Sequence, residues 1–158
     1  MKKSMFNAVI MLFALVFSSA ALNANPTETN VKIFYDQNGN LYNGMYYTYY
    51  EGGLVESELY IVEGKIQGKA YFYYQSGKMM EVGKYVDGQR QGEWVKFNEA
   101  GKKISHANFK DDKKDGEWKI YNNDGQLLFE MHYSMDKKVG TWKQWNEKGE
   151  LVAEQTYN

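Results

Sequence analysis

The 158-residue chain contains no cysteine, one proline and two histidines. Without cysteine, no disulfide stabilises the fold, and no lipid can be attached to a cysteine after a leader. The single proline is Pro26, so from Val31 onward every backbone amide is available for pairing in a β-sheet. Side-chain packing and backbone hydrogen bonding must therefore stabilise the fold.

The scarcity of histidine and cysteine also limits the chemistry. His106 and His132 are placed to approach each other from neighbouring strands, with Glu130 and Glu154 as the plausible helpers. A structural zinc site normally takes a closed set of four Cys or His ligands, so we expect two solvent-exposed histidines, no metal and no cofactor. Ser105 stands directly before His106 without the strand–turn–helix elbow of a hydrolase nucleophile. We expect no catalytic residues and a non-enzymatic protein.

Residues 1–24 have the pattern of a secretory signal peptide. A basic start is followed by an unbroken apolar run over residues 8–17 and then by small, mildly polar residues up to Ala24. Ten apolar residues are too few to span a bilayer, which takes about 20. We expect cleavage after Ala24, although an alanine three or four residues earlier would also serve, and a linker over residues 25–30. The mature protein is then exported, to the periplasm or outside the cell.

The charge balance excludes some classes of partner. The leader holds two lysines and no acidic residue, so the rest of the chain has 17 basic and 20 acidic residues and a net charge of −3. No basic stripe recurs along it. Binding to nucleic acid or directly to anionic lipid needs such an electrostatic surface, and we expect neither.

Two series of glycines recur at an interval of 24 residues without an insertion. A fixed period of this size marks a repeat array. The first series is Gly44, Gly68, Gly92, Gly116 and Gly140, and the second is Gly53, Gly77, Gly101, Gly125 and Gly149. We predict five repeats, over residues 44–67, 68–91, 92–115, 116–139 and 140–158. A degenerate half-unit over residues 31–43 is expected to cap the first repeat.

Large aromatic residues recur in the same frame. With the first glycine of each repeat as position 1, position 3 is Tyr46, Ala70, Trp94, Trp118 and Trp142. Position 6 is Tyr49, Tyr73, Phe97, Tyr121 and Trp145, and position 18 is Ile61, Tyr85, Phe109, Tyr133 and Tyr157. The rings therefore belong to the unit itself, and we expect positions 3 and 18 to form the core.

Each unit is predicted to be a β-hairpin. Residues 116–121 have the aromatic and β-branched content of a strand, and the polar trio closed by Gly125 suits a type I turn followed by a left-handed residue. In the second strand, Phe129, Met131 and Tyr133 alternate with polar residues, which is the period of a half-buried strand. A lone hairpin is marginal in water. The sequence thus predicts an all-β fold, an elongated single-layer antiparallel sheet of stacked 24-residue hairpins.

Two stretches, YVDGQRQGEW at 85–94 and YIVEGKIQG at 60–68, share an order of residues: an aromatic, a short turn with glycine, and a glycine that opens the next strand. This order resembles the MORN repeat (membrane occupation and recognition nexus). The longer unit here, with Gly-x-Trp-x-x-Tyr-x-x-x-Gly, is similar to the bacterial MORN repeat variant over residues 42–158. Asp112 and Asp136 stand where that family has a turn glycine, and we expect a local change of turn there because Asp tolerates the backbone.

The resemblance implies a scaffold or protein-binding platform. Some members of the family have proposed phospholipid contacts, which the charge of this chain does not favour. Many bacterial variants carry an antitoxin label, and an antitoxin that meets a cytosolic toxin conflicts with the predicted export.

The position 6 row is the predicted binding site. Positions 3 and 6 are three residues apart, so in a regular strand their rings point to opposite faces. Either a bulge turns both inward, or aromatic rings line both faces. We expect the row to be partly exposed and to bind a partner protein, since a contiguous apolar stripe marks a binding surface. A cell-wall or other carbohydrate ligand that stacks on the same rings is the alternative.

The far edge of the array is a second candidate surface. The last predicted strand ends at Tyr157, and nothing in the predicted sheet follows it. An exposed edge of this kind suits strand addition or self-association.

Overall fold

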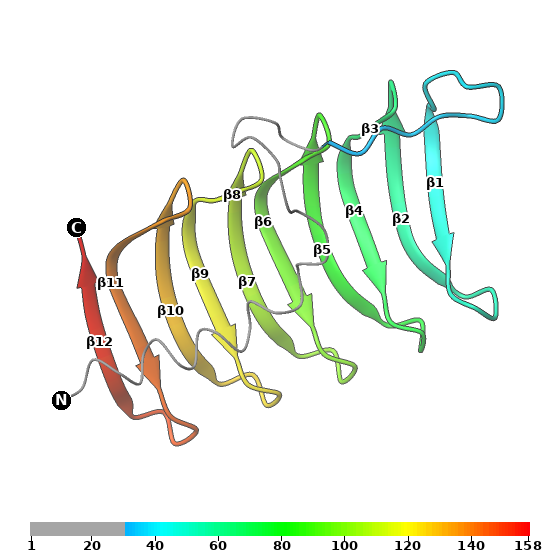
Figure 1. Ribbon diagram of the computed structural model, residues 1–158. Coiled ribbons are helices and arrows are strands. Elements are labelled where there is room, and N and C mark those ends of the chain that lie inside the picture. The colour runs from blue at the N-terminus through cyan, green and yellow to red at the C-terminus, as the bar shows by residue number, and fades with distance from the viewer. Residues whose placement is uncertain (1–30) are drawn as a thin grey trace. The chain divides into compact units, whose positions relative to one another are not determined.

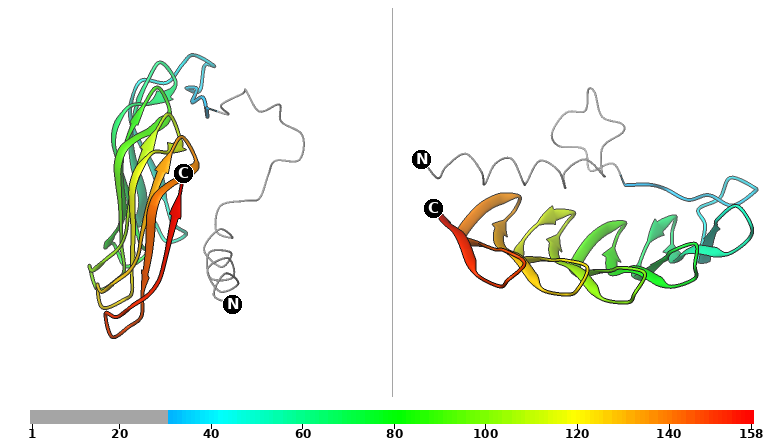
Figure 2. Two further views of the ribbon diagram at one scale, coloured as in Figure 1. Left: turned by 90° about the vertical axis from the view of Figure 1, so that its left-hand side faces the viewer. Right: turned by 90° about the horizontal axis from the view of Figure 1, so that it is seen from below.

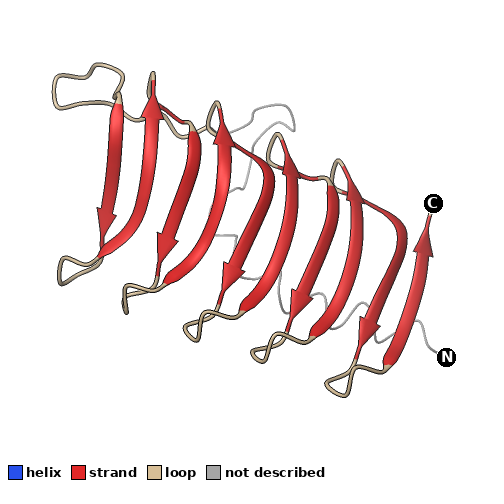
Figure 3. Ribbon diagram, turned by 180° about the vertical axis from the view of Figure 1, so that it is seen from behind, coloured by secondary structure: helices blue, strands red, loops and turns tan. Residues whose placement is uncertain are grey.

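The computed structural model describes residues 31–158, so the predicted signal peptide and linker lie outside the described residues. The described part is one open antiparallel sheet whose strands are joined by short loops, with no helix among them (Figures 1 and 3). Apart from two short two-residue strands, neighbouring strands in the sheet are also neighbours in the chain, and the predicted all-β, single-layer architecture is confirmed.

Ten strands form the main path of the sheet. In order they are β1 (Gly44–Tyr49), β2 (Val55–Val62), β4 (Gly68–Tyr73), β5 (Met79–Val86), β6 (Gln89–Phe97), β7 (Lys103–Lys110), β9 (Gly116–Tyr121), β10 (Leu127–Ser134), β11 (Lys137–Trp145) and β12 (Leu151–Tyr157). The short strands β3 (Lys65–Ile66) and β8 (Lys113–Lys114) pair with β2 and β7. All strands bend in the same direction, so that the sheet is arched (Figure 2).

The second glycine series closes the hairpin turns as predicted. In the fourth unit the Gly125 amide donates to the Asn122 carbonyl at 3.0 Å, and the Asn122 amide donates to the Gln126 carbonyl at 2.9 Å. Gly125 has a φ of +84°, in the left-handed region where a Cβ clashes with its own backbone. The same pair of hydrogen bonds recurs in the other four turns.

The first glycine series has a different place. Val82 of β5 pairs with Val95 of β6, and Lys84 pairs with Gln91. The two β5 residues are two positions apart but their β6 partners are four apart, so β6 bulges here, and Gly92 lies in the bulge. The β10–β11 pairing shows the same shift. Gly44, Gly68 and Gly116 begin their strands as expected, whereas Gly92 and Gly140 lie inside β6 and β11.

The connections between hairpins are tight turns with two central residues of positive φ, the sign pattern that a type I′ turn requires. The backbone at Asp112 (φ +64°) and Asp136 (φ +70°) matches that at Gly88 (φ +80°), so the expected local change of turn is wrong. The Asp112 carboxylate accepts hydrogen bonds from the backbone amide and the Nε of Arg90, at 3.0 and 2.9 Å. Aspartate therefore keeps the turn and adds a bond to the preceding unit.

Positions 3 and 18 alternate in one row of stacked rings, which we call the aromatic ladder. Its members are Tyr85, Trp94, Phe109, Trp118, Tyr133, Trp142 and Tyr157, with successive ring centroids 5.0 to 6.2 Å apart. Trp142 is completely buried and Trp94 is 4% exposed. The indole N–H groups of Trp118 and Trp142 donate to backbone carbonyls of the preceding unit, both at 2.9 Å. The face of the sheet that carries these rings is called the ladder face.

Trp94 differs from the other two tryptophans of the ladder. Its ring lies against Gly83, where an added Cβ would be 2.1 Å from the nearest ring atom. Its indole nitrogen is buried without a hydrogen-bond partner among the described residues. The glycine therefore makes room for a ring that, unlike those of Trp118 and Trp142, donates no indole hydrogen bond to a backbone carbonyl of the described residues.

Cationic side chains cover the ladder. The Arg90 guanidinium lies 3.9 Å from the centroid of the Phe109 ring, and the Lys138 ammonium lies 4.6 Å from the Trp142 ring. Lys114 is placed in the same way, and burial lowers its pKa. These three residues share one position of the repeat, so the aliphatic stems shield the rings while each charge faces a ring.

The segment before β1 completes the ladder face at its other end. Phe34 is buried, and its ring packs edge-on against Tyr46 at 4.9 Å. Its amide donates to the Gly64 carbonyl, and the Gly64 amide donates to the Tyr42 carbonyl. These contacts are those a cap provides, while the bounds of the cap and of the five repeats stay predictions.

Replacing Gly125 by alanine is expected to lower the free energy of unfolding by about 1–2 kcal/mol, because alanine in the left-handed region is strained. No atom lies within 4 Å of the new Cβ, so strain is the only cost. Gly125→Asn, which tolerates this backbone, is the matched control and should cost less. Urea unfolding of the three proteins measures the difference. Equal losses for alanine and asparagine would contradict the left-handed turn.

Alkaline pH is expected to destabilise the ladder. Burial raises the pKa of Tyr85 and of Tyr133 to about 12, from 10.0 in a free tyrosine. The unfolded state then loses its phenol proton first, so the stabilisation is intact below pH 10 and falls as the pH rises towards 12. With Tyr133→Phe, the loss of unfolding free energy over this pH range should be smaller by on the order of 2 kcal/mol. Denaturant unfolding between pH 9 and about 12 measures it, with exposed Tyr35→Phe as control, and equal slopes for all three proteins would refute it.

Candidate functional site

Aromatic rings line both faces of the sheet, which decides between the two alternatives left by the sequence. In the first unit Tyr46 packs on Phe34 on the ladder face. The Tyr47 and Tyr49 rings lie together on the other side, with centroids 6.4 Å apart. We call this side the opposite face. The bulges that the structure contains do not bring position 6 onto the ladder face.

The position 6 row is partly exposed. Tyr49 exposes 57% of its surface, and the other four members, Tyr73, Phe97, Tyr121 and Trp145, are half-buried. Among the described residues, no ring contact joins two successive members of the row. The row is thus a series of separate rings, and its role in binding stays a prediction.

The first two units carry a denser group of aromatic side chains on the opposite face. Tyr47 of β1 stands directly opposite Glu58 of β2, and Glu58 stands directly opposite Tyr71 of β4. Directly opposed residues of an antiparallel pair share a face, so the carboxylate lies between two tyrosines on one surface. Tyr49 and Tyr60 occupy the next positions of β1 and β2 on that face.

We name this group the tyrosine cluster: Tyr47, Tyr49, Tyr60, Tyr71 and Tyr73, with Glu58 at its centre. Partial burial, and after it the Glu58 carboxylate, raises the pKa of Tyr73, with Tyr71 and Tyr47 also contributing. Tyr73 lies two residues from Tyr71 on β4 and is therefore on the same face as the others. Tyr47, Tyr49 and Tyr60 expose 41%, 57% and 47% of their surfaces. Exposed rings around a carboxylate give this end of the sheet a surface that is both apolar and acidic.

The other units replace this cluster by ion pairs. The Lys119 ammonium lies 2.8 Å from a Glu117 carboxylate oxygen and 3.8 Å from Glu130. The hydrogen bond between Lys119 and Glu117 lowers the pKa of the glutamate and raises that of the lysine. The opposite face therefore changes along the array from tyrosines to paired charges.

Both histidines belong to this charged region. His106 Nε2 lies 3.5 Å from Glu93, and Nδ1 lies 3.9 Å from Glu117. His132 Nε2 lies 4.0 Å from Glu130. Only 16% of the His106 side chain is exposed, so the expectation of a solvent-exposed histidine is wrong for this residue.

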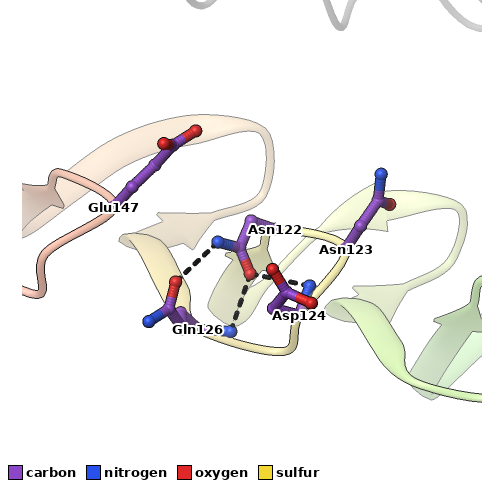
Figure 4. A pocket seen from close by; sticks show the side chains of 5 residues that line it. All are labelled: Asn122, Asn123, Asp124, Gln126 and Glu147. Carbon is purple, nitrogen blue, oxygen red and sulfur yellow. Dashed lines mark hydrogen bonds between the residues drawn. The ribbon is translucent and has the colours of Figure 1, made fainter.

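A shallow recess lies at the turns that close the last two hairpins (Figure 4). It is lined by Asn122, Asn123, Asp124, Gln126 and Glu147. The Asn122 side chain accepts hydrogen bonds from the Asp124 and Gln126 amides and donates to the Gln126 side chain at 2.8 Å. These polar groups bond to one another, as in an Asx-type turn. The recess is thus explained by turn chemistry.

Within residues 31–158, no group of three or more His, Asp or Glu side chains is arranged to hold a metal ion. In the same part of the chain, no helix has the length and apolar character needed to cross a membrane.

Periodicity alone did not reveal the tyrosine cluster. Tyr47, Tyr60 and Tyr71 occupy positions that carry other residue types in later units, so a search for recurrent residues passes over them. The signal was nevertheless present, as the run Tyr-Tyr-Thr-Tyr-Tyr at 46–50 and as five carboxylates against one lysine over residues 31–63.

Comparison with known proteins agrees with this architecture. No protein of curated function matches the chain. The pattern of the MORN repeat variant matches residues 66–87, 90–111, 114–135 and 138–158, at the same 24-residue step and over more than half of the chain. MORN repeats generally act as modules that bind proteins or membranes. The chain belongs to the MORN repeat variant family.

Proposed function

We propose that this chain is an exported, non-enzymatic repeat protein that binds another protein along the opposite face of its sheet. The observation that carries the proposal is the difference between the two faces of the sheet. The ladder face buries its rings under cationic side chains, whereas the opposite face exposes Tyr47, Tyr49 and Tyr60.

Exposed tyrosines of this density favour a protein partner. Contiguous apolar patches on a soluble protein mark interaction sites, and tyrosine is among the residues that contribute most to protein–protein binding. The rings stand on rigid paired strands, so little conformational entropy is lost when they are covered.

Export is the second part of the proposal and rests on residues 1–24, with their basic start, short apolar run and small residues before Ala24. An antitoxin role requires contact with a cytosolic toxin and is the weaker reading for an exported chain.

A glycan is the second candidate ligand. The same exposed rings suit stacking on sugars, and the partly exposed position 6 row gives a series of such rings along the sheet. The acidic residues around the tyrosine cluster favour the protein, because neutral sugars gain nothing from the charge.

The binding surface is tested by a pull-down from envelope extracts with the wild-type protein and a Tyr47/Tyr49/Tyr60→Ser variant. We expect a protein retained by the wild type to be lost with the variant, because all three rings are exposed and their removal leaves the ladder intact. A matched control changes three exposed apolar residues at the other end of the sheet, Met135, Leu151 and Val152, to serine.

Three results decide the outcome of this experiment. Loss with the tyrosine variant and retention by the control support the proposal. Equal recovery by a folded tyrosine variant excludes this surface. If the protein sediments with peptidoglycan and this depends on the three tyrosines, the ligand is a glycan and the proposal of a protein partner is wrong.

Export is tested by fractionating cells that express the full chain. We expect the protein outside the cytoplasm, with a mass that lacks residues 1–24. A full-length protein confined to the cytosol would exclude export, and an antitoxin role would then be compatible with the location of the protein.

A further inference from the structure

Glu58 is the one carboxylate that the tyrosine cluster encloses. Its cross-strand neighbours on both sides are tyrosines, Tyr47 and Tyr71, and Tyr60 is two residues away on its own strand. Glu58 is half-buried. Among the described residues, no ion pair joins it to a lysine, an arginine or a histidine.

The equivalent position of the other units shows that this arrangement is specific to one end of the sheet. The residues there are Val82, His106, Glu130 and Glu154. Glu130 has Lys119 as a partner at 3.8 Å, and Glu154 stands opposite Lys143. Only at Glu58 does the sheet present a carboxylate with rings on both sides and without a cation of its own.

The chemistry of this surface suits a cation. Aromatic faces carry a negative quadrupole that attracts cations, and the carboxylate adds a full negative charge. Residues 31–73, which include the whole cluster, contain three lysines and five carboxylates, so the charge around the cluster is also negative on balance, with Lys69 two residues from Tyr71 on the same face. An anionic group would be repelled.

The shape of the surface distinguishes among cations. The tyrosines stand on the flat face of three adjacent strands, and the planes of the Tyr47 and Tyr49 rings differ by only 30°. A planar guanidinium can stack on such rings and donate two parallel hydrogen bonds to one carboxylate. A rounded quaternary ammonium needs rings on several sides instead.

We propose that the tyrosine cluster is a recognition site for an arginine side chain of the partner protein, which stacks on the tyrosines and pairs with Glu58. This inference rests on the proposed function and specifies the chemistry of its contact. The site is a surface subsite for one side chain and requires no change in the sheet.

The probe is a blocked five-residue peptide, Gly-Ala-Arg-Ala-Gly, added to isotope-labelled protein purified from cells that express the full chain. We expect the peptide to shift the amide resonances of β1, β2 and β4 and to leave those of β11 and β12 unchanged. Replacing its arginine by citrulline, which has nearly the same shape without the charge, should abolish the shifts. Raising the salt from about 50 mM to about 500 mM should weaken them.

Variants of the protein assign the contact. Glu58→Gln should weaken binding about tenfold or more, as expected for loss of a charge-assisted hydrogen bond. Glu154→Gln, at the same position of the last unit, is the matched control and should bind as the wild type does. Tyr47→Phe should bind and Tyr47→Ala should not, because the ring face makes the contact. Unchanged near-ultraviolet circular dichroism confirms that each variant is folded.

The proposal is overturned if the Glu58→Gln variant or the citrulline peptide binds as well as the wild-type pair does. Equal binding of a lysine peptide would also overturn it, in favour of a general cation site, and tighter binding of choline would overturn it in favour of a quaternary ammonium. In the pull-down, a partner lost with the three-tyrosine variant but retained by Glu58→Gln would refute the arginine contact and leave the protein-binding proposal standing. Tight binding of the arginine peptide without any tyrosine-dependent partner in the pull-down would refute the protein-binding proposal and leave the arginine site standing.

Discussion

The fold depends on contact between rings that belong to different repeats. A single-layer sheet has no second layer to bury its side chains, so each tryptophan of the ladder must be covered by its neighbours along the array. Trp142 is completely buried between Tyr133, which comes from the preceding unit, and Tyr157, which comes from its own unit. Because no unit contains its whole core, stability rises with the number of stacked units and a lone hairpin has no comparable core.

This arrangement leaves the opposite face free for other chemistry. The recurrent rings and the cations above them form the core on the ladder face. Residues on the other side can therefore differ from unit to unit without disturbing the core. They do differ, from the tyrosines around Glu58 at one end to the Lys119 ion pairs on β9. Variation within a constant frame is what allows a repeat protein to present a specific surface.

Much of the architecture could be predicted because its causes are local. Gly125 closes a turn that requires positive φ, and a fixed 24-residue spacing of such turns leaves few alternatives to stacked hairpins. The face of the sheet on which each repeat position lies was harder to predict, because bulges shift the pairing by whole residues and cannot be placed from composition. The I′ turn at Asp112 also escaped prediction, since its stability comes from bonds to Arg90 in another unit. The tyrosine cluster escaped because its combination occurs at one place only: Glu130 and Glu154 share the position of Glu58, but Lys119 and Lys143 replace the tyrosines beside them.

The direction of the backbone hydrogen bonds has a mechanical consequence. In an antiparallel sheet these bonds lie perpendicular to the strands, and here the strands follow one another from β1 at one end to β12 at the other (Figure 1). A pulling force applied between the two ends therefore acts along the bonds themselves and separates one strand boundary at a time. Each released repeat then adds its 24 residues to the length, about 80 Å of extended chain. Under tension the protein would lengthen in equal steps, set by the repeat.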